Sequence, residues 1–182
     1  SSFRKLRSAE AAFDLLQKFH RLDSSLQGFM DKYDDILQQY SKEMERARAQ
    51  FDGNKDNPPV YKNYPKVAGA IAWADSIYRK QKRPMVRFVK EERLKAATRF
   101  TEVKDQYVSL CRSIQHYCTN MLTEWREKAN VLAVEGLKKS ILGPAIDTSI
   151  ADAPLPQPPF VVNFSQDLSD LIRETRYLDR MG

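Results

Sequence analysis

Apolar residues recur at steps of three and four along most of this chain, the spacing that gathers them on one face of an α-helix. The clearest run predicts a helix over about residues 24–51, and a less regular run predicts a first helix over residues 3–22. The predicted inward faces are Leu6, Ala9, Phe13, Leu16 and Phe19 in the first helix, and Leu26, Met30, Tyr33, Leu37, Tyr40, Met44, Ala47 and Phe51 in the second. The strict alternation of steps in the second helix is typical of coiled-coil-like packing.

Prolines mark both ends of the third predicted helix. Pro58 and Pro59 cannot lie inside a helix, whereas Pro65 suits a first helical turn, where its missing N–H would have no partner. The helix is therefore predicted to begin near residue 64 and to break or kink at Pro84. Its middle is built from alanine and glycine beside the flanking Trp73, so we expect other helices to pack closely against it.

After Pro84 a further seam predicts either one very long helix or two over residues 86–135. This seam begins with Val86 and Val89 and continues through Leu132. The charged Arg93 lies on this seam and indicates that the helix is interrupted nearby. Gly136 ends the pattern.

The last forty residues change character. Five of the nine prolines lie in residues 144–159, which predicts a loop or an extended arm. Residues 160–164 have the composition of a short strand, which needs a partner, and residues 139–142 are the nearest candidate. Ser165 is then a cap for a last helix, with Leu168, Leu171, Ile172, Thr175 and Leu178 inward.

Together these patterns predict an all-α fold, an elongated bundle of long helices with a short β-hairpin-like element near the C-terminal end. The predicted organisation is a helical bundle over residues 1–143, a Pro-rich loop over 144–159, and a strand and helix over 160–182 that begin a further part.

Composition narrows the class of protein. No apolar run approaches the roughly 20 residues that a membrane-spanning helix requires, and the basic N-terminal residues are not followed by the apolar region of a secretory signal. Cys111 and Cys118 lie seven positions apart on one predicted helix, so about 10 Å of axial rise excludes a disulfide between them. We therefore expect an intracellular protein with ordinary half-buried cysteines.

The net charge of +6 is concentrated in one stretch. Residues 79–95 hold eight basic and two acidic residues, which equals the whole excess, while the remaining chain is balanced. The candidate interface residues are Arg79, Lys80, Lys82, Arg83 and Arg87. This stretch is either a docking surface for an acidic partner or a solvated helix end. A nucleic-acid partner is not expected, because no aromatic residues are interleaved for base stacking.

Residues for catalysis are not evident in the sequence. His20 and His116 are isolated on helical patterns, and general-base catalysis requires a convergent partner. The six glycines form no phosphate-binding loop, and neither cysteine has a neighbour at metal-ligand spacing. We therefore expect no catalytic, cofactor or metal site and no enzymatic activity in this chain.

Two segments carry a resemblance to a known family. In the first, Pro58-Pro59 is followed by Asn63-Tyr64-Pro65, then Val67-Ala68-Gly69-Ala70-Ile71-Ala72-Trp73 and the basic stretch. The second consists of Phe160-Val161-Val162-Asn163-Phe164 and, in the last predicted helix, Leu168, Leu171-Ile172-Arg173-Glu174 and Tyr177-Leu178. A third, weaker match lies in residues 32–43. In this combination and order the chain resembles the N-terminal tail region of dynein heavy chains. The sequence of residues 58–73 is more similar to that of axonemal than of cytoplasmic chains.

The resemblance implies a role and a set of partners. It implies an assembly segment that links an ATP-driven microtubule motor, lying elsewhere in the protein, to intermediate chains, light or light intermediate chains and another heavy chain. It also implies a location in the cytoplasm and cytoskeleton, with the ciliary axoneme favoured, and a short interruption in the long seam, placed at Ala97-Thr98. The structural anchors that it suggests are Pro65, Gly69, Trp73, Tyr78, Asn163 and Phe164.

Two alternative functions remain open from the residues. The heptad-like seams alone indicate a spectrin-like or generic coiled-coil scaffold. The basic stretch on a long helix indicates, less strongly, a membrane-binding helical module that does not insert. The dynein interpretation is favoured because a generic scaffold explains neither the helix that starts at Pro65 nor the Val-Asn-Phe segment.

Overall fold

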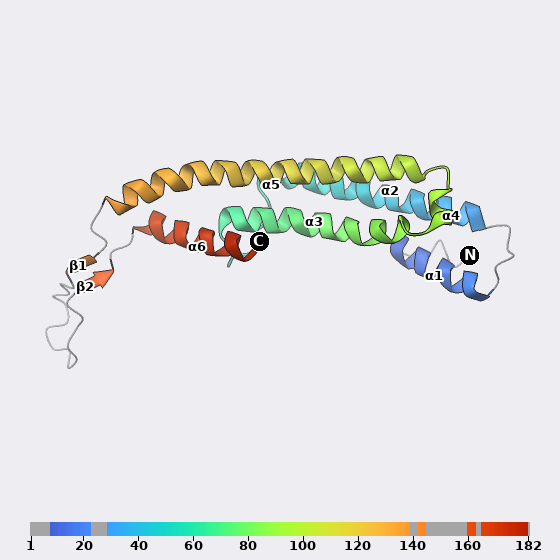
Figure 1. Ribbon diagram of the computed structural model, residues 1–182, viewed down its shortest axis with the longest axis horizontal. Coiled ribbons are helices and arrows are strands. Elements are labelled where there is room, and N and C mark those ends of the chain that lie inside the picture. The colour runs from blue at the N-terminus through green and yellow to red at the C-terminus, as the bar shows by residue number, and fades with distance from the viewer. Residues whose placement is uncertain (1–7, 23–28, 139–141, 145–159, 163–164, 182) are drawn as a thin grey trace, which may run out of the picture. The chain divides into compact units, whose positions relative to one another are not determined.

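The computed structural model describes residues 8–22, 29–138, 142–144, 160–162 and 165–181. In order, its elements are α1 (Ala9–Leu22), α2 (Phe29–Asn54), α3 (Lys66–Phe88), α4 (Glu92–Lys95), α5 (Phe100–Leu137), β1 (Leu142–Pro144), β2 (Phe160–Val162) and α6 (Gln166–Met181) (Figure 1). Helices make up most of the described residues, so the all-α class is confirmed. The predicted start of the first helix, residues 3–7, lies outside the described residues, as do most of the Pro-rich loop and the anchors Asn163 and Phe164.

The chain divides into two compact units. The first comprises residues 1–60 and 70–119, and the second comprises residues 61–69 and 120–182. One division falls in the loop before α3, and the other two fall inside α3 and α5. The domain boundaries predicted at residues 143–144 and 159–160 both lie within the second unit and remain predictions.

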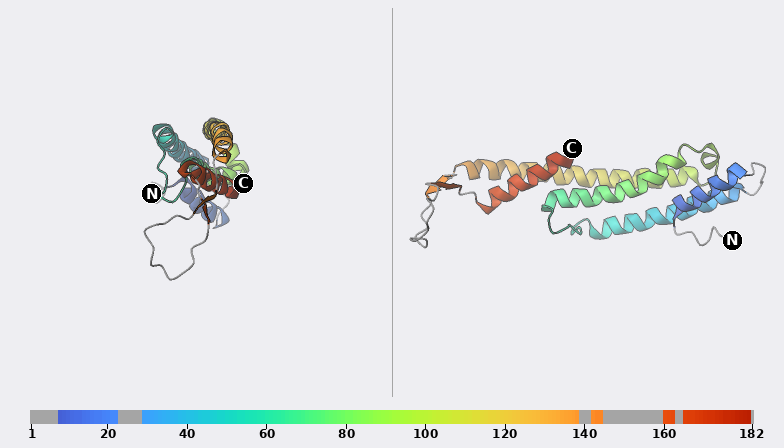
Figure 2. Two further views of the ribbon diagram at one scale, coloured as in Figure 1. Left: turned by 90° about the vertical axis from the view of Figure 1, so that its left-hand side faces the viewer. Right: turned by 90° about the horizontal axis from the view of Figure 1, so that it is seen from below.

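The first unit is a helical bundle with a continuous apolar interior. The parts of α2, α3 and α5 that belong to it run side by side, and α1 lies beside α2 (Figures 1 and 2). One buried cluster joins all of these helices and α4, and its largest fully buried members are Phe13, Tyr33, Tyr40 and Phe88. A second cluster joins α2, α3 and α5 and contains Phe51, Ile77, Leu110 and Ile114. The seam predicted for residues 33–51 of α2 is therefore the core of the unit.

The third helix does not end at Pro84, so the predicted break is wrong, while the alternative of a kink stays a prediction. α3 continues to Phe88 with Pro84 inside it. Proline has no N–H to donate to the preceding turn, and in that turn the Tyr40 hydroxyl donates a 2.7 Å hydrogen bond to the Gln81 carbonyl. The missing N–H of Pro84 would have donated to the Lys80 carbonyl. The Tyr40 hydroxyl binds the next carbonyl along the chain and so ties α2 to the turn of α3 that precedes Pro84.

The continuity of α3 corrects the predicted seam. Met85 and Phe88 are buried, while Val86 and Val89, predicted to face inward, are 43% and 42% exposed. The prediction restarted the helical phase after Pro84, whereas the helix continues in phase from Ile77, so the residue before each predicted valine faces inward. Phe19 and Leu132, also predicted to face a partner, are exposed as well.

The seam of residues 86–135 is not one helix. Residues 89–91 and 96–99 separate α3, α4 and α5, so the interruption predicted at Ala97-Thr98 is confirmed. α5 ends at Leu137, one residue after Gly136. Cys111 and Cys118 are free and half-buried as predicted, and burial raises the pKa of both thiols.

The second unit contains the only strands among the described residues. β1 and β2 pair antiparallel, with Leu142 opposite Val162 and Pro144 opposite Phe160. The predicted strand partner, residues 139–142, shares only Leu142 with β1. With three residues on each side, the pair is too short to be stable alone and does not change the fold class. On α6, Leu168 is buried as predicted, but Thr175 is exposed and Glu174 is buried in its place.

Replacing Tyr40 by phenylalanine tests the hydrogen bond beside Pro84. We expect Tyr40→Phe to lower the free energy of unfolding by about 1–2 kcal/mol, because the buried ring is kept while the Gln81 carbonyl loses its donor. Urea unfolding followed by circular dichroism measures this loss. Tyr61→Phe is the matched control, since Tyr61 is 82% exposed. Equal effects of the two substitutions would contradict the role given to this hydrogen bond.

Candidate protein–protein interface

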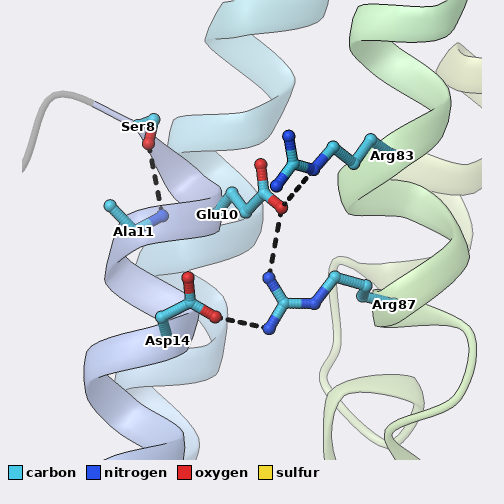
Figure 3. A network of polar contacts seen from close by, with 6 residues as sticks. All are labelled: Ser8, Glu10, Ala11, Asp14, Arg83 and Arg87. Carbon is cyan, nitrogen blue, oxygen red and sulfur yellow. Dashed lines mark hydrogen bonds and ion pairs between the residues drawn. The ribbon is translucent and has the colours of Figure 1, made fainter.

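Two of the five predicted interface residues bind the chain's own first helix. Arg87 of α3 donates to Glu10 at 3.1 Å and also to Asp14, and Arg83 contacts Glu10 at 3.1 Å (Figure 3). The two arginines are four positions apart on α3, and the two carboxylates are four positions apart on α1, so both pairs project from one helix face. We call this network the α1 clamp.

The α1 clamp is strongest at Arg87. Its side chain is 34% exposed, its guanidinium lies 5.3 Å from the centre of the Phe13 ring, and the hydrogen bond that it donates to Asp14 raises its pKa. The Arg83 side chain is 79% exposed, so water screens its ion pair, which contributes little to stability. α1 is also held by its own first amide, since Ala9 N donates to Glu43 of α2 at 2.8 Å.

The other predicted interface residues face solvent. Arg79 pairs with Asp75 one turn earlier on α3, yet its side chain remains 77% exposed. The Lys82 ammonium lies 5.2 Å from the centre of the Tyr78 ring, and Lys80 is exposed. With Arg83 these residues form the basic face of α3, which comprises Arg79, Lys80, Lys82 and Arg83. The exposed Val86 lies on the same side of the helix, so this face combines charge with a small apolar contact.

Trp73 packs inside the first unit. Its ring stacks on Phe51 at 5.8 Å and meets Tyr117 edge-on at 6.4 Å, and Phe51 and Tyr117 are 5.5 Å apart. These three rings from α3, α2 and α5 enclose the end of the second apolar cluster. The indole nitrogen of Trp73 and the hydroxyl of Tyr117 are both buried without a hydrogen-bond partner among the described residues. These contacts support a structural role for Trp73. Half-buried Tyr78 packs on the same cluster, which supports a structural role for that residue too.

In the second unit, α6 holds the start of α3. The Glu174 carboxylate accepts a 2.5 Å hydrogen bond from the Ala68 amide, in the first turn that Pro65 opens. Amides in a first turn have no partner within their own helix, and a carboxylate there also favours the helix dipole. Pro65 and the buried Gly69 lie in this turn, where the Gly69 amide donates to the Pro65 carbonyl at 2.8 Å, and their role as anchors stays a prediction.

The loop before α3 is fixed from the same helix. Arg173 and the Tyr177 hydroxyl both donate to the Asn63 carbonyl, at 2.8 and 3.2 Å, and the rings of Tyr64 and Tyr177 lie 5.2 Å apart. The two segments that carry the family resemblance, more than 100 positions apart, therefore meet through direct hydrogen bonds. Glu174 belongs to the second matching segment, but periodicity gave it no contact, because an acidic residue on an amphipathic helix is ordinarily assigned to solvent.

A model of the family described as dynein heavy chain, N-terminal region 1, matches residues 1–182. The chain belongs to the dynein heavy chains. It is 39% identical over its whole length to the dynein-1-alpha heavy chain of the flagellar inner arm I1 complex from Chlamydomonas reinhardtii, of which it covers 4%. It is 33% identical over 72% of its length to human dynein axonemal heavy chain 10, of which it covers 3%.

A third relative is the dynein gamma chain of the flagellar outer arm from Chlamydomonas reinhardtii, which is 27% identical over the whole chain, with 4% of the relative covered. The predicted family and its axonemal type are confirmed, and this match fits the predicted location in the cytoskeleton of a cilium or flagellum. The chain spans about one twenty-fifth of the length of these heavy chains.

Replacing Glu174 tests how α6 holds the start of α3. We expect Glu174→Ala to lower the free energy of unfolding by about 1–2 kcal/mol, because the Ala68 amide loses a charged acceptor in a buried position. Hydrogen exchange should report faster exchange of that amide. Glu135→Ala is the control, since Glu135 is exposed in the same unit. Unchanged exchange at Ala68 would rule out the capping role.

Replacing Trp73 tests its structural role. We expect Trp73→Ala to destabilise the chain by about 3 kcal/mol, because the indole leaves a gap between two aromatic rings. Trp73→Phe keeps one ring in place and should lose much less stability. Thermal unfolding of both variants measures the difference. A Trp73→Ala chain that keeps its melting temperature but loses binding to another dynein subunit would make Trp73 a surface anchor instead.

Proposed function

We propose that this chain is an assembly segment of a dynein heavy-chain tail, which links the microtubule motor elsewhere in the protein to associated chains. The observation that carries the proposal is the match of the whole chain to the N-terminal region of dynein heavy chains. The proposed partners are intermediate chains, light or light intermediate chains and another heavy chain, in the axoneme. The segment itself binds no nucleotide, and the ATPase belongs to the remainder of the heavy chain.

The helices support a mechanical role. α2, α3 and α5 contain 26, 23 and 38 residues. At 1.5 Å of rise per residue, the longest extends about 57 Å. Each unit is closed by contacts between residues far apart in the sequence, such as the α1 clamp in the first and Glu174 in the second. Long helices fixed in this way can transmit force along the chain without a catalytic site.

The basic face of α3 is the proposed contact surface for an acidic segment of a partner. Arg87 is neutralised by the carboxylates of α1, whereas the exposed Arg79, Lys80 and Lys82 do not take part in the α1 clamp. Their positive charge is therefore available to a partner. Charges at the rim of an interface mainly steer association and make it dependent on salt. The surface therefore sets the rate of assembly more than its final strength.

The generic scaffold is less well supported than the dynein tail. A spectrin-like scaffold requires the heptad seams, but it does not require the hydrogen bonds that join Asn63 and Ala68 to α6. The membrane-binding alternative rests on the basic face alone. Among the described residues, no helix is long and apolar enough to span a bilayer. Pelleting with anionic liposomes tests the remaining possibility of surface binding.

Reversing the exposed charges tests the basic face. In the variant Arg79→Glu, Lys80→Glu, Lys82→Glu, Arg83 is retained because it contacts Glu10. We expect slower association with an intermediate chain or a partner heavy-chain tail and a weaker dependence on salt, with an unchanged circular dichroism spectrum. Co-purification at low and moderate salt provides the measurement.

The matched control reverses three exposed basic residues elsewhere in the first unit, Lys42, Lys104 and Arg112. It changes the net charge by the same amount, so a general charge effect would appear in both variants. Equal recovery of partners by the two variants and the parent chain would reduce the basic face to a solvated surface. Saturable binding of the parent chain to liposomes would favour the membrane alternative.

A further inference from the structure

The loop between α2 and α3 contains the sequence Pro58-Pro59-Val60-Tyr61, which lies outside any helix or strand. Pro59 is exposed, Pro58 and Val60 are half-buried, and Tyr61 is 82% exposed. Tyr61 has the highest exposure of the large hydrophobic side chains in the described part of the protein. None of these residues belongs to the two buried clusters, the α1 clamp or the basic face.

The covalent structure of the segment restricts its conformation. Each proline ring fixes its own φ near −65°, and a residue that precedes a proline is kept out of the helical region. Asn57 and Pro58 are both such residues. The segment is therefore biased toward the extended polyproline II conformation, which has three residues per turn and rises about 3.1 Å per residue. In that conformation Tyr61 follows Pro58 by one full turn, about 9 Å further along the same edge.

The loop leaves most of the Tyr61 side chain exposed to solvent. Beyond Tyr61 the backbone turns, since the Tyr64 amide donates to the Tyr61 carbonyl at 2.9 Å. The Tyr61 ring makes a tilted contact with Tyr64 at 6.3 Å between ring centres, and no hydrogen bond of its hydroxyl occurs within the described residues. The ring and its hydroxyl remain open to solvent, at the end of a stiff pair of prolines.

We propose that residues 58–61 are a docking motif for a small domain with an aromatic-lined groove of the WW class. In this mode of recognition, aromatic rings of the domain stack on consecutive prolines in the polyproline II conformation. A second pocket takes the tyrosine, which offers a large apolar ring and a polar hydroxyl. Because the prolines restrict the free segment to the bound conformation, little conformational entropy is lost on binding.

The spacing of the motif distinguishes this occupant from a related one. SH3 domains recognise two prolines separated by two residues. Here the position three after Pro58 is Tyr61, and the next proline after Pro59 is Pro65, in the first turn of α3. An adjacent proline pair followed by an exposed aromatic residue fits a groove with one proline slot and one aromatic pocket. The proposal is independent of the tail-assembly function, because it uses neither the basic face nor the α1 clamp.

The experiment titrates the 182-residue chain with a purified WW domain that binds Pro-Pro-x-Tyr peptides, followed by isothermal calorimetry. We expect saturable binding with one site per chain. Tyr61→Ala and Pro59→Ala should each weaken it by about ten-fold or more, as expected when a central contact is truncated. Lys62→Ala is the matched control, since Lys62 is exposed directly beside the motif and should leave the affinity unchanged.

Circular dichroism of the variants separates loss of binding from loss of folding, and Tyr61→Ala should keep the parent spectrum because the side chain is exposed. The proposal is overturned if binding does not saturate up to a WW-domain concentration of about 1 mM. A Kd of that size corresponds to a binding free energy of roughly −4 kcal/mol. It is also overturned if binding survives Tyr61→Ala, or if an SH3 domain used in parallel binds the chain as tightly as the WW domain.

Discussion

The first unit depends on α3 keeping its helical phase through Pro84. The proline removes one donor from the ladder of backbone hydrogen bonds, and the Tyr40 hydroxyl donates to the Gln81 carbonyl in the same turn. Because the helix continues, the Phe88 ring reaches the core, where it meets Phe13 and Tyr40 edge-on at 5.3 and 5.2 Å. A break at residue 84 would leave α1 without its main apolar contact on α3.

The same helical phase divides the basic stretch into two parts with different roles. Arg87 lies next to Phe88 in the sequence and faces α1, where its guanidinium lies over the Phe13 ring and binds two carboxylates. Arg79 lies two turns earlier, points to solvent and remains free to contact other molecules despite its pair with Asp75. The charge excess that forms one stretch in the sequence is therefore partly an internal fastening and partly an outer surface. Only the outer part can serve assembly.

The sequence predicted the buried helix faces that follow from local residue spacing. It did not predict features that depend on a contact between distant parts of the chain. Periodicity correctly placed Tyr33, Tyr40 and Phe51 in the core, because burial of a helix face follows from residue type alone. It misplaced the residues after Pro84, since the helix continues through the proline and the contacts that bury Phe88 come from Phe13 and Tyr40 on other helices. It also missed Glu174, because its partner, the Ala68 amide, lies 106 positions away. Basic residues 79–83 were identified correctly as a cluster, but nothing local indicated that α1 would engage Arg83 and Arg87.

The loop before α3 places its two tyrosines in different environments, which bears on why the prolines are there. Tyr64 packs on Tyr177, and the Asn63 carbonyl accepts two hydrogen bonds from α6, so the loop is fixed on its C-terminal side without Tyr61. Tyr61 is twice as exposed as Tyr64, at 82% against 41%. A ring that is mostly in water contributes little to stability through the hydrophobic effect. The loop therefore does not depend on the Tyr61 side chain, which stays accessible to the partner proposed for residues 58–61.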